Sequence, residues 1–314
     1  MGKFIALRLL HAIPVLIGVT FVVFGSLYLV PGDVTNTLLS VFYTEERGDA
    51  LRAELGLDRP MPVQYAMWLW RLLHGDLGIS HMLRAPVVSI LEGKVANSLI
   101  LTGASLLIVI PASFLLGTVA AARFRRLVDR MIVFLALLLA SMPVFWLGIV
   151  LLYLLGVKVH LFPMSGMYNM ANPGGLPDLL HHLVLPAVTT AATSIAIVTR
   201  VTRGAMLDVL NQPYIVSARA RGITSFKVTY VHGARNVLPT FANMCGLQIG
   251  YLFGGAIFSE IIFNWPGVGL QLYQSIIQRD VPMVQGCILA IAVMFVFGNM
   301  LADIVVHALD TRRR

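Results

Sequence analysis

The chain of 314 residues is 58% hydrophobic and only 12% charged, and its mean hydropathy is +0.82. Soluble domains carry about a quarter charged residues, so this composition excludes an ordinary soluble protein and predicts an all-α membrane protein. The formal net charge of +8 indicates basic cytoplasmic loops. It does not indicate nucleic-acid binding, because no basic patch is interleaved with aromatic residues.

Six apolar runs are each long enough to cross a hydrocarbon core of about 30 Å. The first exceeds the apolar length of a signal peptide and no small-x-small pattern follows it, so we expect residues 1–30 to hold a retained transmembrane helix. Pro111, Pro143 and Pro186 predict local kinks. The predicted spans are residues 8–30, 99–122, 131–157, 183–203, 240–263 and 284–309.

Basic residues concentrate in alternate connecting segments. The N-terminus, the 123–130 loop, the 200–236 region and the tail 310–314 are rich in lysine and arginine, whereas the intervening short segments are poor in them. By the positive-inside rule, we expect both termini to be cytoplasmic, in agreement with an even number of spans.

The segment 31–96 is predicted to be extracytoplasmic and helical. One helix is expected from Thr44 to Gly56 and a second from about Pro62 to His74. The second helix carries an apolar face. That face packs on the outer ends of the spans, lies at the level of the lipid headgroups, or forms a rim that receives a delivery protein. Its members are Tyr65, Trp68, Leu69, Leu72 and Leu73.

Motifs for catalysis are absent from the sequence. There is no GxxxxGK[ST] loop for ATP phosphates, and neither HExxH nor a di-metal ExxH pattern occurs. His181 and His182 are adjacent and would point in different directions on a helix, while Cys245 and Cys287 read as buried apolar residues. We therefore predict no catalytic residue, no metal site and no cofactor bound by this chain.

Polar residues inside the spans are candidates for function, because ionisable groups at membrane depth are costly. Glu260 lies near the outer end of the fifth span. Asn299 and Asp303 lie one helical turn apart in the sixth span and share a face. These side chains either bond to neighbouring helices or an interface, or line a path for a solute.

The fifth span also carries glycines at helical spacing. Gly246, Gly250 and Gly254 form a repeated small-xxx-small pattern, which allows another helix to approach closely. This predicts that the fifth span is central and not lipid-facing.

The polar stretch between the fourth and fifth spans predicts two short helices joined at a glycine. Pro213 suits the first turn of a helix, and Gly222 suits the left-handed residue that ends one. Thr224 is a good N-cap for a second helix, which we expect to close at Leu238–Pro239.

This elbow is either a docking site for a partner protein or an amphipathic interfacial elbow. Small side chains at Ser217, Ala218 and Ala220 would let a partner backbone approach, and Arg219 and Arg221 would supply directional contacts. A chain without an ATP site can be driven by ATP through such a docked element.

The elbow resembles the EAA motif (E-A-A-x-x-x-G) of ATP-binding-cassette importer permeases. Residues 216–222 depart from it at Val216 and Ser217, as is common in the peptide-importing branch, and Pro239 comes one residue early. Residues matching that branch include Tyr214, Ile215, Ala218, Arg219, Ala220, Gly222, His232, Arg235 and Asn236. Further matches, in order, are Pro31–Asp33, Leu55–Pro60, Val63–Tyr65, Gly75–Ser80, Ser141–Trp146, Gly246–Gln248, Glu260–Gly269 and Arg279–Gln285.

The resemblance implies the first permease of a dipeptide, oligopeptide or nickel importer in a bacterial inner membrane. It implies a type I importer fold of six helices with an extracytoplasmic helical insertion after the first. Residues 97–309 would form the five-helix core, including a cytoplasmic coupling loop at 204–239. Coupling residues would be Tyr214, Ser217, Ala218, Arg219, Ala220, Arg221, Gly222, His232 and Arg235.

The same resemblance implies the partners. They are a second homologous permease, two cytoplasmic ATPases that bind ATP and Mg²⁺, an extracytoplasmic solute-binding protein and the lipid bilayer, with no nucleic acid. Candidate path or helix-contact residues are Gly250, Gly254, Glu260, Asn299 and Asp303. Nickel or a small metal complex is the alternative cargo. An ion-driven secondary transporter is a further alternative and would need an inverted repeat.

Overall fold

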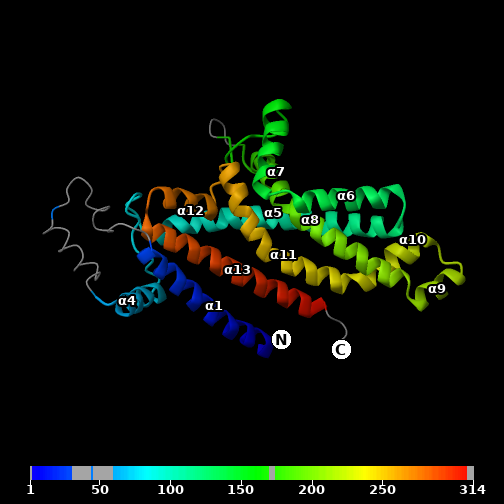
Figure 1. Ribbon diagram of the computed structural model, residues 1–314, viewed down its shortest axis with the longest axis horizontal. Coiled ribbons are helices and arrows are strands. Elements are labelled where there is room, and N and C mark those ends of the chain that lie inside the picture. The colour runs from blue at the N-terminus through cyan, green and yellow to red at the C-terminus, as the bar shows by residue number, and fades with distance from the viewer. Residues whose placement is uncertain (1, 30–43, 45–58, 170–173, 310–314) are drawn as a thin grey trace. The chain divides into compact units, whose positions relative to one another are not determined.

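The computed structural model describes residues 2–29, 44, 59–169 and 174–309, and its regular secondary structure in these ranges is helical, apart from one isolated bridge between Ile79 and Pro86. The prediction of an all-α chain is therefore confirmed for the described residues (Figure 1). Except for Thr44, the predicted helix from Thr44 to Gly56 and the tail 310–314 lie outside the described residues.

The longer helices agree with the predicted apolar runs. Two π-helical segments, Leu152–Lys158 and Val228–Gly233, continue α7 and precede α11. In chain order the helices are α1 (Gly2–Leu29), α4 (Met61–Leu73), α5 (Val87–Ala122), α6 (Leu127–Ser141), α7 (Val144–Leu151), α8 (Leu176–Leu210), α9 (Pro213–Ala220), α10 (Ser225–Lys227), α11 (Ala234–Ile262), α12 (Val268–Ile277) and α13 (Val281–Leu309).

The described helices include four that are long and apolar enough to cross a membrane. These are α5, α8, the continuous stretch Ser225–Ile262, and Val281–Ile304 of α13. The pair Leu127–Ser141 and Val144–Lys158 forms a fifth, broken span, and α1 holds a shorter apolar stretch, Leu10–Gly25. Each of the six predicted spans thus falls on a helix or a bent helix pair.

The third predicted span, residues 131–157, is not one helix. Its two halves meet at an angle of 107°. Pro143 has no backbone N–H and disfavours helical geometry at the preceding residue, and Met142 accordingly adopts extended backbone angles of −82° and 129°. The predicted kink is therefore a break, after which the chain changes direction.

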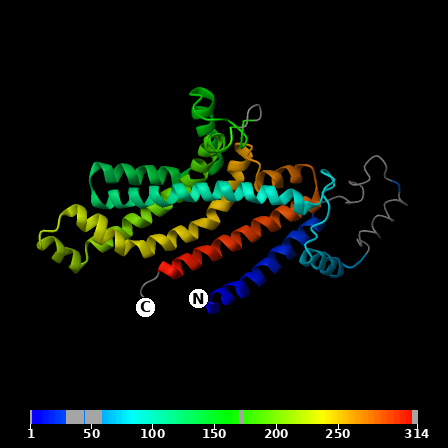
Figure 2. The ribbon, with the colours of Figure 1, turned by 180° about the vertical axis from the view of Figure 1, so that it is seen from behind.

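The structure consists of two compact units, Met1–Val95 with Gln271–Val293 and Ala96–Leu270 with Met294–Arg314. In the second unit, α8 packs against α6, α7 and α11, an arrangement visible from both sides in Figures 1 and 2. Small residues let these helices approach. The same holds between α5 and α8, where a Cβ added at Gly117 of α5 would lie only 2.7 Å from Cβ of Thr202 and 2.9 Å from the carbonyl oxygen of Thr199. The predicted fourth span, 183–203, is the buried middle of the longer helix α8.

An ion pair joins α6 to α8. Arg203 donates from Nε to Oδ1 of Asp129 at 2.6 Å and from Nη2 to Oδ2 at 2.9 Å. The Asp129 carboxylate is buried and also accepts the backbone N–H of Arg125 at 2.8 Å. The guanidinium lies over the ring of Phe124, 5.4 Å from its centroid. A buried charge needs such complete pairing, so this contact fixes α6 on α8 beside the 123–130 loop.

In the first unit, the apolar face of α4 packs on α1. The Tyr65 ring lies 5.8 and 5.5 Å from the rings of Phe21 and Phe24, and its hydroxyl is 2.9 Å from Thr20 Oγ1. Trp68 lies 5.8 Å from Phe24. The first alternative for this face, packing on the end of a span, is thus confirmed at these residues.

A second contact in the first unit holds the loop between α4 and α5. The Asp280 carboxylate, which precedes α13 and is buried, accepts the hydroxyl of Ser80 at 2.5 Å and the N–H of His81 at 3.4 Å. Ser80 Oγ in turn accepts the N–H of Leu83 at 3.0 Å. Asp280 and Ser80, which both lie in segments that the family resemblance highlights, thus meet in one hydrogen-bond network.

Glu260, at the end of α11, organises the loop that leads to α12. Its Oε2 accepts the N–H of Gly269 at 2.6 Å and that of Leu270 at 3.2 Å, while Oε1 accepts the Ser98 hydroxyl at 2.5 Å. Ser98 Oγ also accepts the N–H of Val268 at 2.9 Å. The carboxylate therefore caps the N-terminus of α12, where negative charge and acceptor atoms are most stabilising.

The rest of the loop is bonded to α5. Trp265, fully buried, donates from Nε1 to the carbonyl of Asn97 at 2.9 Å, and the Asn97 amide donates to the carbonyl of Pro266 at 2.9 Å. A side chain at Gly267 would collide with Glu260, so glycine is required there by close packing. Of the alternatives for Glu260, bonding to neighbouring elements is the one observed.

We predict that Glu260→Ala destabilises the protein by about 1–3 kcal/mol, because the Ser98 hydroxyl and two backbone N–H groups lose a buried acceptor. Glu260→Gln, which keeps one acceptor oxygen, should lose less. Thermal unfolding of the purified transporter in detergent measures both.

Glu92→Ala removes an exposed glutamate of α5 and serves as the control. A Glu260→Ala protein as stable as the Glu92→Ala protein would contradict the capping role.

Candidate functional site

The elbow between α8 and α11 has the predicted form of two helices joined at a glycine. Pro213 begins α9, and the chain leaves it through Gly222, whose φ is +78°. The N–H of Gly222 donates to the carbonyl of Arg219 at 2.9 Å, and the N–H of Ile223 donates to that of Ala218 at 3.3 Å. This is a Schellman motif, in which glycine is favoured because its φ is positive.

The inner face of the elbow packs on the helices of its own unit. Ile215 and Ala218 are buried in a cluster that includes Met206, Val228 and Val237. The expectation that the small side chain of Ala218 admits a partner backbone is therefore corrected. Its size instead allows α9 to lie close against α8 and the start of α11.

The outer face of the elbow is exposed to solvent. Its exposed residues are Tyr214, Ser217, Arg219, Ala220, Arg221, Gly222, His232 and Arg235. Phe226 is also exposed, and its ring packs at a tilt against that of Tyr230, with ring centroids 4.7 Å apart. Eight of the nine predicted coupling residues are thus exposed to solvent, and the ninth, Ala218, is buried.

The second half of the elbow does not end at Pro239, contrary to expectation. Residues 225–262 form one continuous helical stretch, with Pro239 inside α11. The proline removes one backbone hydrogen bond, to the carbonyl of Arg235. Val237 and Phe241 on either side are buried, so packing holds the helix through this point. Thr224 precedes this stretch, but its side chain makes no capping hydrogen bond.

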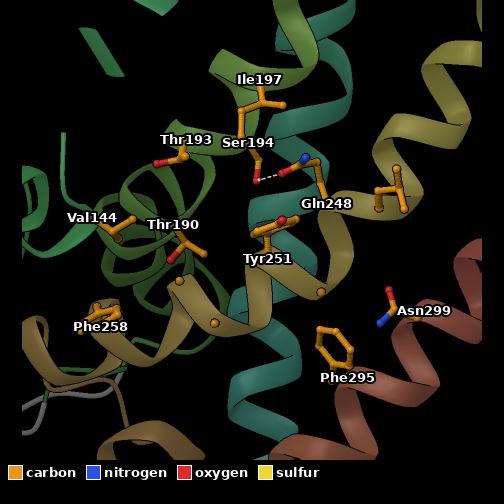
Figure 3. Close-up of a pocket in the computed structure, with 14 residues that line it drawn as sticks. Val144, Thr190, Thr193, Ser194, Ile197, Gln248, Tyr251, Phe258, Phe295 and Asn299 are labelled. Carbon is orange, nitrogen blue, oxygen red and sulfur yellow. Dashed lines mark hydrogen bonds between the residues drawn. The ribbon is translucent and has the colours of Figure 1, made fainter. Parts of the chain in front are cut away.

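A cavity of about 660 Å³ lies farther along the same unit, between α8, α11 and α13, with Val144 at the start of α7 (Figure 3). Hydroxyl and amide groups line it at Thr190, Thr193, Ser194 and Gln248, and Ser194 Oγ donates to Gln248 Oε1 at 2.9 Å. None of its lining residues is charged. The volume falls within the range of small-molecule sites, about 300–1,000 Å³.

Three of the five predicted path residues line this cavity: Gly250, Gly254 and Asn299. Glu260 does not, since its carboxylate is engaged at the N-terminus of α12. Asp303 lies one turn beyond Asn299 on α13, half-buried and outside the lining. The predicted close approach at the glycine row occurs at Gly250, where the ring of Phe295 leaves no room for a side chain.

Sequence reasoning missed most of the polar lining. Thr190, Thr193 and Ser194 follow one another on α8, and the available signal was this cluster of hydroxyl groups within an apolar run. Such residues usually bond to their own helix backbone. Thr190 does so at the carbonyl of Pro186, 2.9 Å away, and its Oγ1 also lies 2.7 Å from the hydroxyl oxygen of Ser259, with which it shares a hydrogen bond.

The adjacent histidines are engaged within the chain. The Nε2 atom of His181 is 2.9 Å from the carbonyl of Leu161, and His182 pairs with Asp178 at 3.0 Å. Among the described residues, no group of three or more His, Cys, Asp or Glu side chains is arranged to hold a metal ion.

Comparisons with known proteins agree with these features along the whole chain. Residues 113–314 match the family described as "Binding-protein-dependent transport system inner membrane component", and residues 1–94 match the corresponding N-terminal family. The chain is 35% identical to the dipeptide transport system permease protein DppB of Escherichia coli over 336 aligned positions, which cover 100% of this chain and 99% of the relative.

Two further relatives are similar to a like degree. A putative peptide permease protein of Brucella suis is 37% identical, with 97% of each chain covered. The oligopeptide transport system permease protein AppB of Bacillus subtilis is 34% identical, with 99% of each chain covered. The helical core, the elbow and these full-length matches establish that the chain belongs to the inner-membrane permease family of binding-protein-dependent transport systems.

Proposed function

We propose that this protein forms half of the translocation path of an ATP-driven peptide importer. The observation that carries the proposal is the full-length similarity to permeases named for dipeptide and oligopeptide transport. A second, homologous permease would complete the path, two cytoplasmic ATPases would drive it, and an extracytoplasmic binding protein would deliver the cargo.

The cavity between α8, α11 and α13 supports a peptide more than a nickel ion. Nickel prefers imidazole, thiolate or carboxylate ligands, and none of these lines the cavity. Amide and hydroxyl groups, such as those of Asn299 and Ser194, suit the N–H and C=O groups of a peptide.

The exposed face of the elbow is the proposed contact with the ATPases. The sequence lacks a phosphate-binding loop, so the energy of ATP must arrive through a contact with another protein. Ile215 and Ala218 pack α9 against α8 and α11 of its own unit. A force applied at the exposed Ser217, Ala220 or Arg221 would therefore be passed into α8 and α11.

The first test is uptake by the complete transporter, reconstituted in proteoliposomes with its second permease, ATPases and binding protein. We expect ATP-dependent accumulation of a labelled dipeptide or oligopeptide and none of Ni²⁺. Accumulation of Ni²⁺ with no peptide uptake would contradict the proposed cargo. Uptake without ATP, driven by an ion gradient, would contradict the importer class.

We further predict that the elbow and both termini face the cytoplasm. In a chain whose native Cys245 and Cys287 are replaced by serine, Ser217→Cys should react with a membrane-impermeant maleimide only in inverted vesicles. Met82→Cys, exposed on the loop before α5, should react only from the outside. The reverse pattern would contradict the orientation.

For the coupling contact, we predict that Ala220→Phe lowers both ATPase recovery on purification and peptide uptake by at least about tenfold, because an added ring at a docked surface blocks close approach. Ala122→Phe, at an exposed alanine ending α5, is the matched control and should retain both. Normal ATPase binding and uptake in the Ala220→Phe protein would contradict docking at this face.

A further inference from the structure

Three glycines of α11 line the cavity, Gly250, Gly254 and Gly255. A Cβ at Gly255 would make an ordinary contact with Thr190 Cγ2, 3.7 Å away. Gly250 and Gly254 lie one helical turn apart and differ in what surrounds them. A Cβ at Gly250 would lie 3.0 Å from Cζ and 3.2 Å from Cδ2 of Phe295, so this glycine is needed for packing within the chain. At Gly254, apart from its chain neighbours and the backbone of its own helix, no atom lies within 4 Å of the place that a Cβ would occupy. The room at Gly254 is left open by the chain itself.

Glycine inside a helix is unfavourable relative to alanine, and packing explains it at Gly250 but not at Gly254. Gly254 is exposed and borders the cavity, with Phe258 one turn farther along the same helix (Figure 3). Any side chain at position 254 would enter the open space. The missing side chain therefore adds directly to the volume available to an occupant of the cavity.

The lining carries no charge, so this half of the path cannot select by attraction or repulsion of ionised side chains. Its polar groups are hydroxyls and amides, which serve neutral and charged cargo alike, and two of them already bond to each other across α8 and α11. What remains to discriminate between solutes of one class is the space beside Gly254.

From these observations we infer that Gly254 determines which peptides pass by the bulk of their side chains, and that the cavity is indifferent to their charge. This inference rests on the proposed function, because it takes the cavity as the path and peptides as the cargo. It assigns the limit on side-chain bulk to a single position of α11, separate from any selection made by the binding protein.

The test is a series of variants, Gly254→Ala, Gly254→Leu and Gly254→Phe, in the complete reconstituted transporter. Uptake of dialanine is compared with that of diphenylalanine, which carries the same terminal charges and far larger side chains. We expect Gly254→Leu to lower the ratio of diphenylalanine to dialanine uptake by at least about tenfold, with Gly254→Ala intermediate. Uptake of alanyl-lysine relative to alanyl-glutamate should stay unchanged across the series.

Gly103→Leu is the matched control. Gly103 is also exposed and lies inside α5, in the second unit. Beyond its chain neighbours and its own helix backbone, no atom lies within 4 Å of a Cβ placed there, and Gly103 does not line the cavity. Its variant should keep the wild-type ratio, which separates the loss of space from the change of a helical glycine.

Several results would overturn the inference. If uptake of both dipeptides falls by the same factor in the Gly254 variants, and less of the second permease copurifies with them, position 254 is a helix-packing site. An unchanged ratio, or one that shifts equally in Gly103→Leu, would also overturn it, as would a changed lysine-to-glutamate ratio. If the wild-type transporter moves peptides but the Gly254 variants show none of these shifts, only the inference is refuted. If the wild-type transporter moves no peptide, the proposed function is refuted as well.

Discussion

A backbone within lipid has no water to bond, so each place where this chain stops being helical near the membrane depends on partners inside the protein. The end of α11 is the clearest instance. Glu260 and Ser98 accept backbone N–H groups at the start of α12, and Asn97 and Trp265 bond the loop to α5. With these partners in place the chain can turn sharply, and the ends of α11 and α12 are held on α5.

The predictable parts of the fold are those specified by local chemistry. The length of an apolar run predicts a span, Pro213 predicts the start of α9, and Gly222 predicts its left-handed end, all of which the structure contains. The parts that could not be predicted depend on neighbours. Pro239 resembles a helix end, but buried residues on both sides carry α11 past it. At Pro143 the same residue type breaks the span by 107°.

The candidate site likewise has features that the sequence predicts and features that depend on neighbouring helices. Gly250, Gly254 and Asn299 could be identified from spacing and polarity within apolar runs, and all three line the cavity. Spacing could not reveal that one glycine faces Phe295 while the other faces open space, because that difference depends on α13. Likewise, Ala218 and Ala220 look alike in the sequence, yet one is buried against the chain's own core and the other is exposed.

The continuity of residues 225–262 has a mechanical consequence. At 1.5 Å per residue, the helical path of this stretch is about 57 Å long, and it bends along its course (Figures 1 and 2). One end emerges from the elbow, the middle forms a wall of the cavity, and the far end is pinned through Glu260. Because the helix is uninterrupted between these points, a displacement at the elbow would be passed along it to the residues that line the cavity. Motion imposed at the elbow would therefore widen or narrow the cavity without any helix having to unfold.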